Sequence, residues 1–112
     1  QNIRKQRNYR MAIEKSFFPT QPNLGIIDRA YYKVHDVIPL TDNMYLANVW
    51  VYINEYERQN NPDIPFAQNR MKFEIDPSAF IEGISENENQ IKQSYNKLKN
   101  LTDSFKNDST DV

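Results

Sequence analysis

Apolar and polar residues alternate with a period of two in four stretches of the chain, which is the pattern of half-buried β-strands. The clearest case is residues 70–76, where every second residue is apolar and the residues between are charged. Successive strand side chains point to opposite faces, so each stretch can turn its apolar residues to a core and its polar residues to water. The strands predicted in this way are residues 9–18, 26–40, 44–56 and 70–76.

A helical period replaces this alternation near the C-terminus. Ser85 and Glu88 have the spacing of a capping box, in which each side chain accepts a hydrogen bond from the backbone of the other residue. Downstream, apolar residues recur three and four positions apart at Ile91, Tyr95 and Leu98, with Phe105 continuing the series. The sequence therefore predicts one helix that begins near Ser85, runs through Phe105 and packs one face on the sheet.

Proline, glycine and asparagine mark the connections. Residues 19–25 and 39–43 have turn chemistry, whereas residues 57–68 form a polar, proline-punctuated stretch that we expect to project as a loop. The sequence thus predicts one small α+β domain over residues 9–106, a mostly antiparallel sheet of about four strands packed against one C-terminal helix. A flexible basic arm at residues 1–8 and a frayed acidic tail at residues 107–112 would flank it.

The strand predicted at residues 44–56 has two apolar faces. One face, which includes Val49 and Val51, is expected in the core, and the other carries Trp50 and Tyr52. This second aromatic surface has two interpretations, a seat for the rings of the helix or an exposed contact patch. We favour the seat, because large exposed apolar patches are unusual on monomeric proteins.

The stretch 26–40 carries the chain's single histidine. If its alternation is regular, Ile38 shares a face with Val34, and His35 and Asp36 point to opposite faces. The histidine and the aspartate then cannot form a catalytic dyad. The sequence also contains no cysteine and no nucleophile elbow, so we expect no catalytic residues.

No cofactor or metal site is expected either. Glycine-rich phosphate loops are absent from the sequence. The acidic residues near positions 63–76 and 82–88 lack the spacing and the glycine of a calcium loop, and helix capping and solvation account for them.

Composition narrows the class of protein. The chain has 112 residues, 38% of them hydrophobic and 12% aromatic, with a mean hydropathy of -0.84 and no window of about twenty apolar residues. We therefore expect a soluble domain with a small aromatic core and no membrane span. The 14 basic residues nearly balance the 15 acidic ones, so net charge favours no class of partner.

Local charge is less even at the start of the chain. Arg4, Lys5, Arg7 and Arg10 surround Tyr9, an arrangement that can neutralise phosphates and stack on a base. Such an arm is more often a solvated tail or a strap between subunits. Binding of nucleic acid by a non-enzymatic accessory protein is therefore the alternative function, not the first.

Three pieces of the sequence, in this order, resemble a known group: residues 49–58, residues 73–76, and residues 89–101 followed by Asp111 and Val112. The group consists of small, poorly characterised tailed-phage proteins, and the resemblance covers roughly residues 31–112. It implies a structural part of the virion, from the tail, baseplate or neck, with other virion proteins as partners and a homo-oligomer or ring as its assembly. The location would be the virion, assembled in the host cytoplasm, or otherwise the cytoplasm.

The function expected from the sequence is therefore assembly through protein–protein contacts. The surfaces expected to make those contacts are the sheet edges, the 57–68 stretch and the basic arm. The candidate contact residues are Arg4, Lys5, Arg7, Arg10, Trp50, Tyr52, Arg58, Asp63, Ile64 and Phe66.

Overall fold

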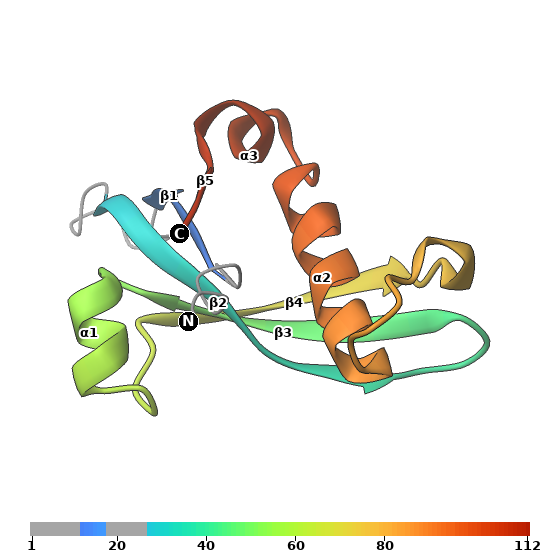
Figure 1. Ribbon diagram of the computed structural model, residues 1–112. Coiled ribbons are helices and arrows are strands. Elements are labelled where there is room, and N and C mark those ends of the chain that lie inside the picture. Colours follow the sequence, from blue (N-terminus) through green and yellow to red (C-terminus); the bar gives the residue numbers. More distant parts are fainter. Residues whose placement is uncertain (1–11, 18–26) are drawn as a thin grey trace.

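The computed structural model describes residues 12–17 and 27–112. They form an antiparallel five-stranded sheet in the order β4-β3-β2-β1-β5, with α2 lying across one face (Figure 1). The α+β class and the antiparallel sheet are as expected, but the number of strands is five, not four. The strands are β1 (Ile13–Phe17), β2 (Ile27–Pro39), β3 (Met44–Tyr52), β4 (Ala67–Glu74) and β5 (Thr110–Asp111). The helices are α1 (Glu55–Asn60), a 3-10 turn η2 (Pro77–Ala79), α2 (Glu86–Lys99) and α3 (Asp103–Asp108).

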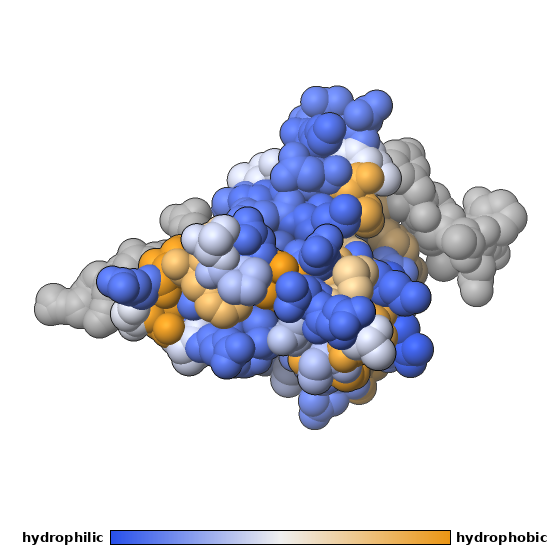
Figure 2. All heavy atoms as spheres, turned by 90° about the vertical axis from the view of Figure 1, so that its right-hand side faces the viewer, coloured by the Kyte–Doolittle hydropathy of each residue, from blue (hydrophilic) through white to orange (hydrophobic). Residues whose placement is uncertain are grey.

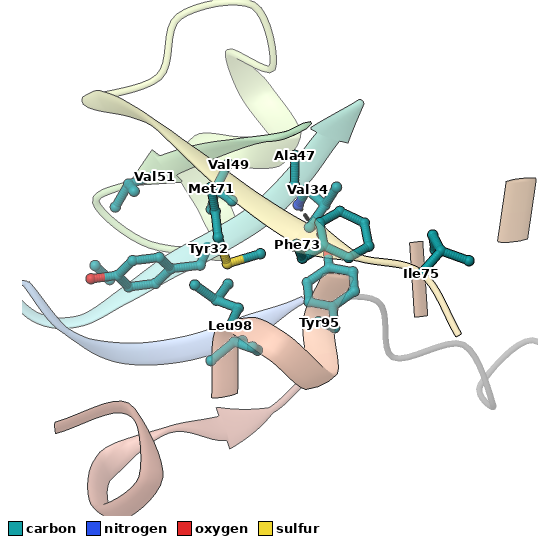
Figure 3. Close-up of a cluster of buried hydrophobic side chains, with 12 residues drawn as sticks. Tyr32, Val34, Ala47, Val49, Val51, Met71, Phe73, Ile75, Tyr95 and Leu98 are labelled. Carbon is teal, nitrogen blue, oxygen red and sulfur yellow. Dashed lines mark hydrogen bonds between the residues drawn. The ribbon is translucent and has the colours of Figure 1, made fainter. Parts of the chain in front are cut away.

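The core lies between α2 and the sheet face that it covers (Figure 3). Alternate residues of the central strands supply it, as the period of two predicts, and Tyr95 and Leu98 of α2 close it. The backbone amide of Val34 donates to the Tyr95 hydroxyl at 2.8 Å, so this buried ring is anchored at its polar end. Burial raises the pKa of the Tyr95 hydroxyl. The buried members of the core are Ile13, Ala30, Tyr32, Val34, Ala47, Val49, Val51, Met71, Phe73, Ile75, Tyr95 and Leu98.

The capping box at the start of α2 is present. Ser85 Oγ accepts from the amide of Glu88 at 3.0 Å, and Glu88 Oε1 accepts from the amide of Ser85 at 3.2 Å. The far end differs from the prediction, because α2 stops at Lys99 and does not continue through Phe105. Thr102 caps a new helix, α3, by accepting from the amide of Phe105.

A bulge in β2 reverses its alternation beyond His35. The pairing with β3 shifts between Val34 and Asp36, so one extra residue is accommodated there. Ile38 therefore does not share the core face with Val34, as it would in a regular strand: Ile38 is exposed, and Val37 packs against the core.

The stretch expected to be a projecting loop is partly helical. The strand β3 ends at Tyr52 and not at residue 56, and Asn54 caps α1 by accepting from the amide of Glu57 at 2.9 Å. Only residues 61–66 connect α1 to β4 without regular structure. Figure 1 places α1 at the end of the sheet opposite the β2–β3 turn.

The tail expected to fray is part of the sheet. β5 pairs with β1, and the amide of Val112 donates to the carbonyl of Ala12 at 3.0 Å. Asp108 accepts from both the amide and the hydroxyl of Ser16, at 3.0 and 2.7 Å.

Arg29 completes the attachment of the tail. Its guanidinium donates to Asp108 Oδ1 and the Asp108 carbonyl, at 3.1 and 3.0 Å, and to Thr110 Oγ1 at 2.9 Å. It also donates to the carbonyl of Glu14 at 3.0 Å. We call Ser16, Arg29, Asp108 and Thr110 the C-terminal clasp.

Candidate interaction surface

The face of the sheet opposite α2 carries a stacked pair of rings. The His35 imidazole and the Trp50 indole are parallel to within 5°, with centroids 3.6 Å apart. His35 lies two residues after Lys33, which pairs with Trp50, so the alternation of β2 places the histidine on this face. The bulge that follows changes the faces of Asp36 and Val37, and not that of His35.

Trp50 and Tyr52 therefore do not seat the rings of the helical segment. Tyr95 belongs to the core cluster on the other face, and Phe105 packs edge-on against Tyr32 at 5.4 Å. The predicted seat is wrong because β3 turns Val49 and Val51, and not Trp50, toward α2.

A groove of about 240 Å³ runs beside the stacked rings. Its far wall comes from α1 and the turn that follows. The Tyr52 hydroxyl donates to the carbonyl of Pro62 at 2.6 Å, which fixes that turn against β3. The residues that line the groove are Lys33, Val34, His35, Trp50, Tyr52, Arg58, Pro62 and Asp63. We call it the aromatic groove.

Two cations set the electrostatics of the aromatic groove. Burial lowers the pKa of the Lys33 ammonium, and the positive charge of Arg58 lowers it further. Burial raises the pKa of the Tyr52 hydroxyl, an effect that Arg58 opposes and Asp63 reinforces. The groove thus combines flat rings, two positive charges and one carboxylate, a chemistry suited to a planar or aromatic group that carries negative charge.

An apolar surface adjoins the groove. Ile53, Tyr56, Ile64 and Phe66 expose 46%, 68%, 72% and 39% of their areas, although all are large hydrophobic residues. We call these four side chains the apolar rim. Three of them, Ile53, Ile64 and Phe66, line a depression of about 350 Å³. Tyr52 lines this depression as well as the aromatic groove.

The rim is held in place by the core and by α1. Phe66 packs edge-on against Phe17, with ring centroids 5.9 Å apart, and its amide donates to the carbonyl of Val51 at 2.8 Å. The opposite end of the molecule, at the β2–β3 turn, shows hydrophobic areas separated by hydrophilic ones (Figure 2).

The structure brings six of the predicted contact residues together. Trp50, Tyr52, Arg58 and Asp63 line the aromatic groove, and Ile64 and Phe66 belong to the apolar rim. The other four, Arg4, Lys5, Arg7 and Arg10, lie outside the described residues.

Sequence reasoning missed six members of this surface, namely Lys33, Val34, His35 and Pro62 of the groove and Ile53 and Tyr56 of the rim. Lys33 pairs with Trp50 across the two central strands, a signal that depends on knowing the register. His35 shares the face of Lys33, as the alternation predicts, but its stacking on Trp50 also depends on the register of β2 with β3. Ile53 and Tyr56 were assigned to a strand, although the capping residue Asn54 between them indicates a helix start.

The bulge breaks the regular alternation, so the expected placement of His35 and Asp36 on opposite faces does not hold. Asp36 accepts from the side-chain amide of Asn48, which lies on the same face of β3 as Trp50, and His35 stacks on Trp50. The imidazole is thus engaged with an indole and the carboxylate with an amide. Within residues 12–17 and 27–112, no group of three or more histidine, aspartate or glutamate side chains could hold a metal ion. In the same ranges, no helix has both the length and the apolar content needed to cross a membrane.

Comparison of the chain with protein-family models, with curated proteins and with solved structures found no match.

Proposed function

We propose that this chain is a non-enzymatic assembly protein that binds other proteins through the apolar rim and the adjoining aromatic groove. The observation that carries the proposal is the rim itself: four large hydrophobic side chains exposed within 14 positions, from Ile53 to Phe66, at one end of the sheet. Exposed apolar residues that gather in one place are typical of binding surfaces, whereas single ones are ordinary.

The rim has the organisation of a protein interface. Apolar side chains occupy one part of it, while Arg58, Lys33 and Asp63 border the neighbouring groove. Interfaces commonly combine an apolar centre with a polar border, and tyrosine, tryptophan and arginine contribute much of their binding energy. A partner that fits would insert aliphatic or aromatic side chains at the rim and carry acidic groups nearby.

We further propose that the assembly is a phage virion, with the chain in the tail, baseplate or neck and other virion proteins as its partners. The support for this step is the sequence resemblance described above. The location would then be the virion. The broader proposal, assembly by protein contacts, depends on the rim and not on the resemblance.

Replacing Ile64 with Asp tests the broader proposal. The side chain is 72% exposed, so the substitution leaves the fold intact while placing a charge in the rim. We expect the native assembly to lose mass and the variant to stop co-purifying with its structural partner. Ile81→Asp is the matched control, since Ile81 is 52% exposed but lies beyond η2, away from the rim. A wild-type chain without a partner, or equal effects of the two variants, would contradict the proposal.

The alternative is a nucleic-acid-binding accessory protein. The aromatic groove favours it, because Trp50 and His35 offer a stacking platform and Lys33 and Arg58 offer charge for a phosphate. Binding should then weaken steeply with added salt and fall when Arg58 is replaced by Ala. Replacing Arg4, Lys5, Arg7 and Arg10 with Ala would measure the contribution of the basic arm. Salt-independent binding would exclude this function.

A further inference from the structure

Among residues 12–17 and 27–112, no strand pairs with the outer edge of β4. β4 is last in the order of the sheet, and in the described part of the chain it pairs with β3 alone. Its register with β3 runs without a shift, and the amide of Ile75 donates to the carbonyl of Asn43 at 2.8 Å. Because backbone groups of an antiparallel strand face alternate sides, the amides and carbonyls of the even-numbered residues point away from β3. These residues are Gln68, Arg70, Lys72 and Glu74.

A side chain closes this edge at one end. The amide of Asp76 donates to Gln93 Oε1 at 2.8 Å, and Gln93 Nε2 donates to the carbonyl of Asp76 at 2.9 Å. Gln93 of α2 thus makes the two hydrogen bonds that a neighbouring strand would make. Strand pairing along the edge is therefore limited to the residues before Asp76.

The charges along β4 have a self-complementary order. Arg70 and Lys72 come before Phe73 and point away from the core. Glu74 and Asp76 come after it and are also exposed. A second copy of the strand, antiparallel and centred on Phe73, would place each basic residue opposite an acidic one. Lys72 would face Glu74 of the other copy, and Arg70 would face Asp76, with each pair occurring twice.

Neighbouring registers do not share this property. A register centred on Lys72 places Lys72 opposite its own copy, and one centred on Met71 places Arg70 opposite Lys72. If the register shifts by one residue, the outward-facing residues of one copy lie opposite residues of the other copy whose backbone groups already bind β3. Like charges that face each other across strands are destabilising, so the sequence of β4 selects the register centred on Phe73.

We propose that two copies of this chain pair through β4 in that register, about a two-fold axis beside Phe73, so that the two sheets become one. Backbone hydrogen bonds would join Lys72 and Glu74 to their counterparts. Arg70 and Asp76 would meet through side chains only, since Gln93 occupies the backbone of Asp76. The contact is isologous and closes on itself, so it gives a dimer.

This inference deepens the proposed assembly function by naming a second copy as one partner, but it uses a different surface. The apolar rim is free in such a dimer to bind another protein. A ring, as the resemblance implies, would combine the two-fold contact with a second, heterologous one. Each proposal can therefore fail without the other.

The test is the mass of the full chain in solution as a function of its concentration, by sedimentation or light scattering. We expect a monomer–dimer equilibrium. Lys72→Glu places like charges opposite each other twice and should weaken dimerisation roughly tenfold or more. Glu74→Lys should do the same. A chain with both Lys72→Glu and Glu74→Lys again places opposite charges against each other in both 72–74 pairs, so its dimer should be as strong as that of the wild type.

Mixing the two single variants gives a second readout. A Lys72→Glu chain and a Glu74→Lys chain are complementary at both pairs, so the mixture should form a heterodimer although each chain alone is monomeric. Lys97→Glu on the exposed side of α2 is the charge-matched control and should leave the dimer unchanged. The proposal would be overturned if the wild-type chain is a monomer at every concentration, or if neither single charge reversal weakens dimerisation. Ile64→Asp should remove the structural partner and leave the dimer, which separates this proposal from the proposed function.

Discussion

The two edge strands of the sheet, β5 and β4, differ in length and in the contacts that hold them. At one edge β5 covers β1, and the C-terminal clasp fixes it with hydrogen bonds from Ser16 and Arg29 to Asp108. At the other edge, in the described part of the chain, β4 pairs with β3 alone, and Gln93 caps the backbone of Asp76 just beyond it. A short edge strand offers few backbone groups for pairing, so the two-residue β5 limits pairing at its edge, whereas the eight-residue β4 offers a longer edge to the second copy that we propose.

The largest effect expected is at the β5 edge. Arg29→Ala removes the hydrogen bonds to Glu14, Asp108 and Thr110 together, and we expect the free energy of unfolding to fall by about 1–3 kcal/mol. Arg29 also adopts a φ of 72°, a conformation that costs alanine more than glycine. Arg29→Gly should therefore be less destabilising than Arg29→Ala, by about 1 kcal/mol.

Urea denaturation of both variants measures these differences, and amide exchange at Thr110 and Val112 shows whether the tail has detached. Lys97→Ala on the exposed side of α2 is the control and should change stability by less than about 0.5 kcal/mol. If Arg29→Ala were as stable as Lys97→Ala, the clasp would not hold β5 on β1.

Acid should open the β5 edge selectively. Hydrogen bonds from the Ser16 hydroxyl and amide, with the positive charges of Arg29 and Lys15, hold the pKa of Asp108 below its ordinary value of 3.8. A carboxyl whose pKa is lower when folded stabilises the protein fully above the unfolded value, and this contribution is lost as pH falls through the folded value.

Exchange rates of the β5 amides should consequently rise below a pH of about 4, while the β3–β4 amides stay protected. In Asp108→Asn, the β5 amides should exchange faster at neutral pH and lose this acid dependence. An acid response of β5 that persists in Asp108→Asn would assign it to another group.

The smallest effect concerns the cap at the β4 edge. Gln93→Ala frees the backbone of Asp76, which lengthens the edge available to a second copy. We expect dimerisation to strengthen several-fold, because the Arg70–Asp76 pair would gain backbone hydrogen bonds. Sedimentation of the variant beside wild type measures the change. Weaker or unchanged dimerisation would mean that Gln93 does not limit the edge.

Local patterns in the sequence were sufficient for the central elements. The alternation in residues 70–76 and the capping box at Ser85 are both present in the structure, because each depends on neighbours in the sequence. The six clustered contact residues lie on β3, α1 and the turn after it, so the chain itself keeps them close.

The features that sequence reasoning missed depend on distant partners. Asp108 has a fixed position only because Ser16 and Arg29 lie beside it, 92 and 79 positions away, and without them residues 107–112 have the composition of a frayed tail. The bulge at His35 likewise appears only in the pairing of β2 with β3, and that pairing decides the faces on which Asp36, Val37 and Ile38 lie.

The stacked position of Trp50 provides a built-in optical reporter. It is the only tryptophan in the chain, so the intrinsic emission at long wavelength comes from one indole. His35 covers one face of that indole at 3.6 Å, and the aromatic groove runs beside it. Protonating the imidazole, or inserting a side chain or base beside it, would therefore change the emission, and occupancy of the groove can be followed in the unlabelled protein.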